Sequence, residues 1–395
     1  MKILSNNLLN ILIICFLFGT IVFSSCSKKG CTDPASLNYD ADAKEDDGTC
    51  VYDTGYTVPA TYNFNNVSNG GQAVRLLLLD DLVTKIAEAD AGTVTKADLV
   101  LIYENTNNLH SNIATGKNLK DKVATTAIDS TIVDYFAQIE SLSSAGKGYV
   151  SDSGIDLKQT IEKTLMGAIF WYQALSYLNG VPDDDNEAVT AGEGTDMEHH
   201  FDEAFGYFGA ARDYNDYTDA EIKSPSEKDS DADGTIDPES EKCSYFALTA
   251  AKRDLGALAV SATSTLDYTK TIFDALLEAR AAISNIDYPK RNTAITTIKD
   301  NWEEIIAATV IHYINEVKSD ISSGSTSLNQ HWAELSGYFN MIPHRTDNKL
   351  GSSTIATING YIGKKPADAT ATNLDKAAQL IQVAYGFSDE LVAGW

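Results

Sequence analysis

The feature that most constrains this chain is a ten-residue pattern that occurs twice. His200-Phe-Asp-Glu203-Ala-Phe-Gly-Tyr-Phe-Gly returns as His331-Trp-Ala-Glu334-Leu-Ser-Gly-Tyr-Phe-Asn, at an offset of 331 − 200 = 131 residues. Both copies read His-aromatic-x-Glu-x-x-Gly-Tyr-Phe. Self-similarity at a fixed offset is the signature of a repeated structural unit, so the sequence predicts an internal duplication.

The repeat extends upstream of the motif. Residues 163–178 align with 303–318 at an offset of 140, so the first copy carries nine more residues in its connection, which falls in the polar loop 180–186. Each copy is then an apolar helix, a loop and a short aromatic-rich helix that begins at His-x-x-Glu. Such helix pairs cannot bury their apolar faces alone, so two halves, 72–222 and 244–395, should pack around a shared core.

Helical periodicity runs through the chain from Gln72 onward. Apolar residues recur there at spacings of three and four, which is the period of one helix face. No run of alternating strand residues competes with it. The sequence therefore predicts an all-α fold of two related helical-bundle halves behind a short disulfide-tied stalk. Further helices are expected at 96–105, 127–142, 157–178, 197–208, 244–261, 269–284, 291–319, 328–339 and 374–385.

The first 25 residues have the layout of a secretory signal. They carry one positive charge, Lys2, then an apolar run over 8–23 and small residues before a cysteine. The junction Val-Phe-Ser-Ser-Cys26 resembles a bacterial lipobox, which implies that Cys26 is lipidated and anchors the mature chain in a lipid bilayer. An ordinary signal peptide cut near Ser25 is the alternative. We expect a cell-envelope protein anchored to the outer membrane on its periplasmic or surface face.

Residues 26–55 are expected to form the anchor and a stalk, ahead of one domain at 56–395. Cys31 and Cys50 lie close in sequence, and a disulfide between them would contribute about 3 kcal/mol in the chain-entropy model. The segment resembles a cysteine-bracketed motif found beside lipid anchors, with Ser36 where alanine is usual. Its acids could hold calcium, but a spacer is the interpretation we favour. Cys243 is left as an unpaired thiol, expected to be buried.

The net charge of −26 bears on the partners of the chain. Binding of nucleic acid demands a basic face, so this charge argues against a nucleic-acid partner. It suits a protein outside the cytoplasm that tolerates or binds cations.

A calcium-loop pattern lies between the halves, in the insert 226–241. Aspartates stand at positions one, three, five and nine and Gly234 at six, as in loops whose carboxylates surround the ion. Position twelve is Ser240 instead of glutamate, and Glu239 or Glu241 could substitute for it. An unstructured acidic linker is the alternative. The expected calcium ligands, in a structural role, are Asp229, Asp231, Asp233, Thr235, Asp237 and Glu241.

The His-x-x-Glu motif carries the candidate chemistry. Residues three apart share one helix face, so His200 with Glu203, and His331 with Glu334, can each supply half of a site for zinc, iron or manganese. His199 is an additional candidate. The alternative is a hydrogen-bonded pair without a metal. The His-Glu-x-x-His, phosphate-loop, G-x-S-x-G and paired CxxC motifs are absent, so no catalytic residue is assigned.

Several segments resemble an uncharacterised family of bacterial lipoproteins that is defined as a domain of unknown function. They are Glu162-Lys-Thr-Leu-Met-Gly-Ala, the run Gly-Thr-Asp-Met-Glu-His-His-Phe-Asp-Glu-Ala-Phe-Gly-Tyr-Phe-Gly at 194–209, Lys252-Arg-Asp, Arg280-Ala-Ala-Ile and His312-Tyr. The resemblance covers about 56–395, and it implies a fold without an activity. More distantly, the chain resembles imelysin-like proteins, which are exported, helical and associated with iron uptake. That likeness carries over only to His200 and Glu203.

These observations predict a lipoprotein that binds a metal ion, or a metal-containing ligand of the haem type, in iron or nutrient acquisition. The alternatives are a non-catalytic envelope scaffold with an unknown protein partner and a metallohydrolase. The two motifs either meet in one site or lie apart, in which case Gly-Tyr-Phe makes a close helix contact. We expect separate sites with the first copy functional, because the second copy replaces His199, Asp202 and Phe205 by Gln330, Ala333 and Ser336.

Overall fold

The computed structural model describes residues 28–34, 36–50, 55–254 and 266–395. It divides into two compact units, Met1–Tyr56 and Thr57–Trp395. The predicted signal segment and Cys26 lie outside the described residues. Among those that are described, no helix combines the length and apolar character that a membrane crossing requires.

The first unit is built around the predicted disulfide. Cys31 and Cys50 are bonded, with their Cα atoms 4.7 Å apart, which confirms the pairing. Beside it, strand β1 (Lys29–Gly30) pairs in parallel with β2 (Glu45–Asp46). The unusual Ser36 is buried, and its Oγ lies 2.7 Å from Cys31 Sγ and donates to the Asp33 carbonyl oxygen at 2.7 Å.

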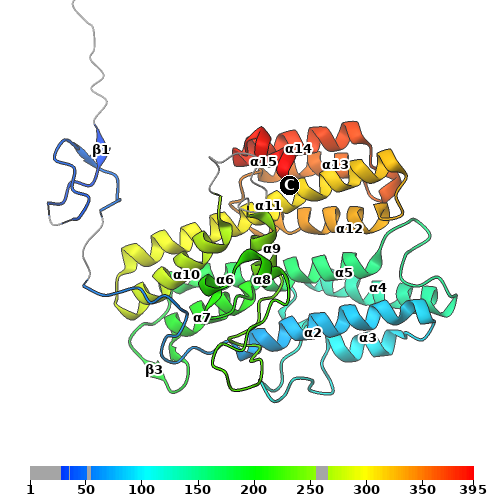
Figure 1. Ribbon diagram of the computed structural model, residues 1–395, viewed down its shortest axis with the longest axis horizontal. Coiled ribbons are helices and arrows are strands. Elements are labelled where there is room, and N and C mark those ends of the chain that lie inside the picture. The colour runs from blue at the N-terminus through cyan, green and yellow to red at the C-terminus, as the bar shows by residue number, and fades with distance from the viewer. Residues whose placement is uncertain (1–27, 35, 51–54, 255–265) are drawn as a thin grey trace, which may run out of the picture. The chain divides into compact units, whose positions relative to one another are not determined.

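The second unit is helical, which confirms the all-α prediction (Figure 1). One short antiparallel pair, β3 (Val189–Thr190) with β4 (Gly194–Thr195), precedes the first motif helix. A π-helical segment, Met166–Trp171, joins α5 to α6. The helices are α2 (Gly70–Ala87), α3 (Lys96–Tyr103), α4 (Thr126–Ser144), α5 (Leu157–Leu165), α6 (Tyr172–Gly180), α7 (Asp196–Phe208), α8 (Asp219–Lys223), α9 (Phe246–Arg253), α10 (Tyr268–Ser284), α11 (Tyr288–Ser323), α12 (Leu328–Phe339), α13 (Gly351–Ile362), α14 (Ala371–Tyr385) and α15 (Asp389–Gly394).

Local sequence sets the ends of the motif helix α7. Thr195 caps its start, because the threonine side chain accepts from the Glu198 amide while the Glu198 side chain accepts from the Thr195 amide. The helix stops at Gly209, which adopts a left-handed φ of 80° that favours glycine. The first motif therefore sits on a well-defined helix of three to four turns.

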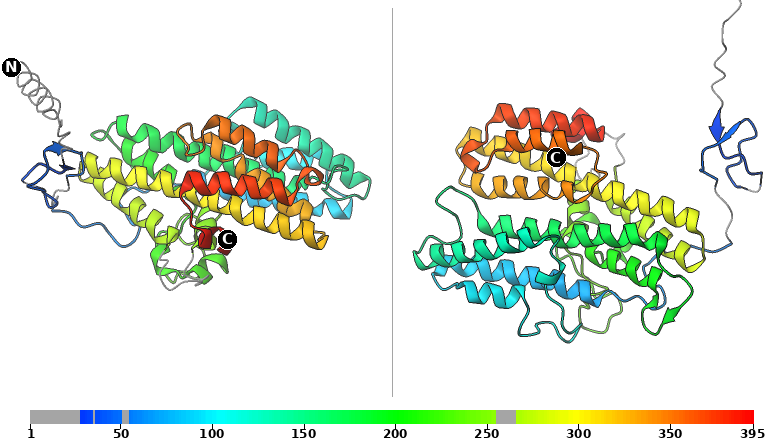
Figure 2. Two further views of the ribbon diagram at one scale, coloured as in Figure 1. Left: turned by 90° about the horizontal axis from the view of Figure 1, so that it is seen from above. Right: turned by 180° about the vertical axis from the view of Figure 1, so that it is seen from behind.

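The helices of this unit stack in a row. In Figures 1 and 2, α14 lies against α11, α11 against α12, α12 against α5, α5 against α2 and α2 against α3. The contact between α12 and α5 joins the two halves. Trp302 of α11 packs on Trp171, Phe208 and Phe246, with ring centroids 5.0 to 5.2 Å apart. One continuous hydrophobic core contains residues of both halves, as predicted.

Some helix predictions were wrong in detail. α9 ends at Arg253, because the Asp254 carboxylate instead accepts hydrogen bonds from the backbone amides of Tyr268 and Thr269 at the start of α10. The remainder of the helix predicted there, 255–261, lies outside the described residues. α8, α13 and α15 were not predicted from the sequence.

Candidate functional site

The first cluster is formed by His200 of α7 and residues of the preceding helix and loop. The His200 Nδ1 atom lies 2.8 Å from Oδ2 of Asp184, in the loop after α6. The imidazole stacks on the Tyr177 ring, with centroids 5.5 Å apart. The side chain of His200 is 38% exposed. An Nδ1–H that donates to Asp184 leaves Nε2 as a free acceptor on a partly exposed side chain.

Glu203, one turn further along α7, has different partners. Gln72 Nε2 of α2 donates to Glu203 Oε1 at 2.7 Å. The Tyr177 hydroxyl also donates to Glu203, and burial together with this carboxylate raises the pKa of Tyr177. Lys122 Nζ donates to the Tyr177 oxygen at 3.3 Å. Glu203 is thus tied to α2 and α6, and no hydrogen bond or ion pair joins it to His200.

The second cluster, on α11 and α12, has the same arrangement. His331 Nδ1 lies 2.8 Å from Asp320 Oδ2, and Asp320 is buried. The Tyr313 ring centroid is 6.1 Å from that of His331. Glu334 is only 7% exposed, and burial raises its pKa against the opposing effects of Lys163 and a hydrogen bond from Tyr313.

The tyrosine, aspartate, histidine and glutamate of the two clusters correspond. Tyr177 corresponds to Tyr313 and Asp184 to Asp320, both at an offset of 136 (313 − 177 and 320 − 184). The upstream alignment at 140 was therefore wrong by four residues. A slip of about one helical turn keeps apolar residues on the same face, so the apolar pattern alone does not reveal it. The two connections differ by five residues, not nine.

The glycine of each motif allows a close helix contact. A Cβ atom at Gly206 would lie 2.7 Å from Cβ of Gln72, and one at Gly337 would come closer still to Cβ of Lys163. Contacts of that length are not observed for real Cβ atoms. α2 and α5 therefore occupy equivalent places against α7 and α12, and the predicted close contact is confirmed for the glycine. Gln72 and Lys163 are the corresponding neighbours of the two motif glutamates.

The four motif residues do not gather in one place. Within the described ranges, the one group of three or more His, Cys, Asp or Glu whose ligand atoms lie within 4.8 Å of one another is Asp229, Asp231 and Asp233. His199 lies beside His200, with ring centroids 6.0 Å apart, and its Nδ1 is buried without a hydrogen-bond partner. The described residues therefore form two separate clusters, and the first contains an additional imidazole.

Two residues that distinguish the first copy have structural roles. Asp202 is fully buried and accepts from Arg280 Nε and from the Tyr62 hydroxyl, each at 2.8 Å. Phe205 stacks on the Tyr62 ring at a centroid distance of 3.7 Å. Arg280 also contacts Glu198 at 2.6 Å. Asp202 and Phe205 thus hold the N-terminal segment and α10, and they give no reason to assign function to the first copy alone.

One family model matches the two segments of the chain that contain the histidine clusters. The family model described as Domain of unknown function (DUF4856) matches residues 135–238 and 257–343. The chain matches DUF4856. The first matched segment contains α5 to α7 and the second contains α10 to α12, so each segment holds one cluster. No curated protein and no solved structure gave a match.

The calcium-loop pattern lies at the end of the first DUF4856 segment. The Asp229 carboxylate accepts from the amides of Asp233 and Gly234, at 3.1 and 3.0 Å. Glu241 is 3% exposed, and its carboxylate accepts from the amides of Ser230 and Asp237 at 2.8 and 2.9 Å. Glu241, not Ser240, therefore folds back onto the loop.

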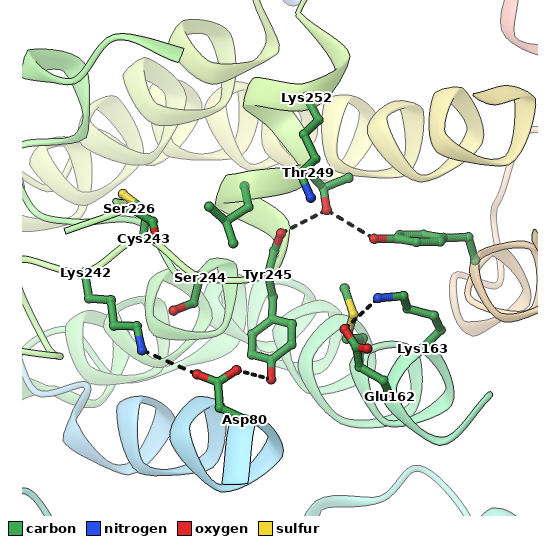
Figure 3. Close-up of a pocket in the computed structure, with 13 residues that line it drawn as sticks. Asp80, Glu162, Lys163, Ser226, Lys242, Cys243, Ser244, Tyr245, Thr249 and Lys252 are labelled. Atoms are coloured by element: carbon green, nitrogen blue, oxygen red, sulfur yellow. Dashed lines mark hydrogen bonds and ion pairs between the residues drawn. The ribbon is translucent and has the colours of Figure 1, made fainter. Parts of the chain in front are cut away.

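A pocket of about 310 Å³ lies between the two halves, and the sequence did not predict it (Figure 3). Its walls come from α2, α5, the π-helical segment, α9, α12 and the segments around 226 and 242. The lining residues come from distant parts of the sequence, and four of them fall within segments that carry the family resemblance: Glu162, Lys163, Met166 and Lys252. The lining residues are Asp80, Glu162, Lys163, Met166, Ser226, Lys242, Cys243, Ser244, Tyr245, Leu248, Thr249, Lys252 and Tyr338.

Proposed function

We propose that this chain is an exported, lipid-anchored protein that binds transition-metal ions, such as zinc or iron, at its two histidine clusters. One observation carries the proposal. In both copies the His Nδ1 atom lies 2.8 Å from an aspartate oxygen, which leaves Nε2 unoccupied. Histidines that ligate metals almost always donate their other N–H to a carboxylate, a carbonyl or water, which fixes the tautomer and makes the ligating nitrogen more basic.

The surroundings of the two imidazoles suit a cation. The side chains of His200 and His331 are 38% and 22% exposed, so an ion can reach both. Asp184 and Asp320 supply negative charge behind the rings, and Glu316 Oε2 lies 3.9 Å from His331 Nδ1. These carboxylates would partly neutralise a bound dication, which lowers the free-energy cost of removing its hydration water.

The small number of protein donors favours a loosely held ion or a metal-containing ligand. Each cluster offers one Nε2, and the first adds His199. Glu203 and Glu334 are the nearest carboxylates on the same helix faces, but both are hydrogen-bonded to tyrosines. An ion held there would keep positions for water or for an organic ligand, as in sites that pass metal on rather than store it. A haem-type ligand belongs to the same proposal.

The cellular setting is also proposed. A signal at 1–25 and lipidation of Cys26 would anchor the chain in the outer membrane, with the Cys31–Cys50 unit as the stalk. The distant resemblance of His200 and Glu203 to imelysin-like proteins agrees with a role in iron acquisition. A non-catalytic scaffold and a metallohydrolase remain the competing functions.

Calorimetric titration with zinc tests the proposal. We expect two zinc ions per chain, with one lost in His200→Ala, one lost in His331→Ala and both lost in the double variant. His110→Ala is the matched control, because His110 also contacts an aspartate, Asp81, but through Nε2 at 2.7 Å. Unchanged zinc binding by the double variant would favour the scaffold. Zinc-dependent turnover of a peptide or ester by the wild-type chain would favour the hydrolase.

We also propose that the loop at 229–241 holds a structural calcium ion. The exposed carboxylates of Asp229, Asp231 and Asp233 lie within 4.8 Å of one another, and the buried Glu241 closes the loop beneath them. Calcium prefers such oxygen ligands. Removing calcium with EDTA should speed protease cleavage within 226–241 without changing helix content, because only this loop orders around the ion. Equal cleavage rates with and without calcium would contradict the assignment.

A further inference from the structure

We propose that the pocket between the halves binds a small organic monocarboxylate, with the carboxylate at Lys252 and the apolar body against Met166 and Leu248. The site is separate from the histidine nitrogens, and the inference does not rest on metal binding. The pocket volume of about 310 Å³ lies at the lower end of the range typical of small-molecule sites.

Of the three lysines that line the pocket, two are paired with carboxylates, and one remains available to a ligand. Lys163 Nζ is paired with Glu162 at 2.6 Å, and Lys242 Nζ contacts Asp80 at 3.4 Å. Lys252 has no hydrogen-bond or ion-pair partner within the described part of the chain. Figure 3 shows its ammonium beside Thr249, at the upper edge of the lining residues. In a chain of net charge −26, this pocket therefore carries one excess positive charge.

The electrostatic state of Lys252 supports the same assignment. Lys252 is exposed as a residue, yet partial desolvation and the charge of Lys163 lower its pKa against the opposing effects of Glu334 and Glu162. Lys163 is already paired with Glu162, so an anion that enters the pocket would be attracted chiefly to Lys252. A bound carboxylate would offset the repulsion from Lys163 and return the pKa of Lys252 toward its ordinary value.

The polar groups beside Lys252 can orient a carboxylate. Thr249 Oγ1 donates to the Tyr245 carbonyl oxygen at 2.9 Å, so its proton is already used. The Tyr338 hydroxyl lies 3.4 Å from Thr249 Oγ1, a long contact that leaves its proton able to turn to a stronger acceptor. Tyr338 and Lys252 would then hold the two carboxylate oxygens from opposite elements, α12 and α9.

The backbone at the pocket wall is strained. Tyr245 adopts φ 43° and ψ −98°, a combination that non-glycine residues rarely show. The conformation aims its side chain at α2, where the hydroxyl donates to Asp80 Oδ1 at 2.7 Å. A strained residue of this kind lowers the folding equilibrium constant by roughly a few-fold to a hundredfold. Such residues cluster at binding sites.

The excess of a single positive charge selects the ligand class. Asp80 and Glu162 also line the pocket, and they would repel the second charge of a phosphate dianion. Met166 and Leu248 offer apolar surface that inorganic anions cannot use. A monocarboxylate with a short hydrocarbon body satisfies both conditions.

Titration with hexanoate, monitored by NMR of the full chain, tests the inference. Hexanoate should bind once per chain, and neutral hexanol and inorganic phosphate should each bind at least tenfold more weakly. Lys252→Met should weaken hexanoate binding at least tenfold, because a hydrogen bond to a charged group is lost. Lys252→Arg should stay within about threefold of the wild type, since it keeps the charge.

Lys270→Met provides the matched control. Lys270 is an exposed lysine paired with Asp274 on α10, away from the pocket lining, so hexanoate binding should not change. Circular dichroism and urea denaturation check that Lys252→Met is folded. Equal binding of hexanol and hexanoate, a preference for phosphate, or full binding by a folded Lys252→Met chain would each overturn the inference. None of these outcomes depends on whether the histidine clusters bind zinc.

Discussion

Replacing the motif glycines by alanine should destabilise the chain, although alanine is the better helix former. In an open helix, Gly→Ala gains about 1 kcal/mol in helix propensity. At Gly206 the new Cβ would lie 2.7 Å from Gln72 Cβ and 3.0 Å from Asn69 Cβ, where ordinary contacts are 3.4 to 4 Å. α7 and α2 must therefore separate by roughly 1 Å, and overpacking of this kind costs about 1–3 kcal/mol.

The separation would also stretch the Gln72–Glu203 hydrogen bond, which is 2.7 Å long. We expect Gly206→Ala and Gly337→Ala each to lower the free energy of unfolding by about 1–2 kcal/mol, measured by urea denaturation followed by circular dichroism. Gly360 is the matched control, because it lies within α13 and no atom would come within 4 Å of its added Cβ.

Gly360→Ala should stabilise the chain by about 0.5–1 kcal/mol. Stabilisation of similar size in all three variants would refute the close packing of α7 on α2 and of α12 on α5. Destabilisation of all three would instead show that the effect is not specific to the motif.

Two further predictions concern buried charges. Arg280→Met should lower the free energy of unfolding by about 3–5 kcal/mol in urea denaturation, because it leaves the fully buried Asp202 without its counter-charge; adding Asp202→Asn should recover part of the loss, and no recovery would argue against the pair. Burial lowers the pKa of His344 to about 4, below its value of about 6.5 in an unfolded chain. Because protonation then favours unfolding, stability should fall by about 1–2 kcal/mol between pH 7 and pH 5. His344→Gln should flatten this part of the pH profile, and an identical profile would contradict it.

Local patterns in the sequence were sufficient for much of the fold. The long helices follow from apolar spacing, and α7 follows from a Thr-x-x-Glu capping box and a terminal glycine. α13 was missed because its residues are mostly small or polar, and only Ile358 and Ile362 are buried. Whether such a segment is helical depends on its packing against α14, which the sequence does not display.

The candidate site was predictable only in part. His200 and His331 were found because they repeat, but their aspartate partners lie 16 and 11 residues upstream, at different distances in the two copies. That difference, caused by the longer connection in the first copy, hides the equivalence from a fixed-offset comparison. The pocket residues come from four helices, the π-helical segment and two connecting segments, and only the tertiary fold brings Lys252 near Tyr338.

The central claim is that Nε2 of each motif histidine ligates a metal while an aspartate holds Nδ1. Anomalous X-ray diffraction from crystals of the chain soaked in zinc measures this most directly. We predict two separate zinc peaks, one beside His200 Nε2 and one beside His331 Nε2, with the contacts to Asp184 and Asp320 intact. Zinc found only among Asp229, Asp231 and Asp233, or bound at Nδ1 after displacement of the aspartates, would contradict the claim.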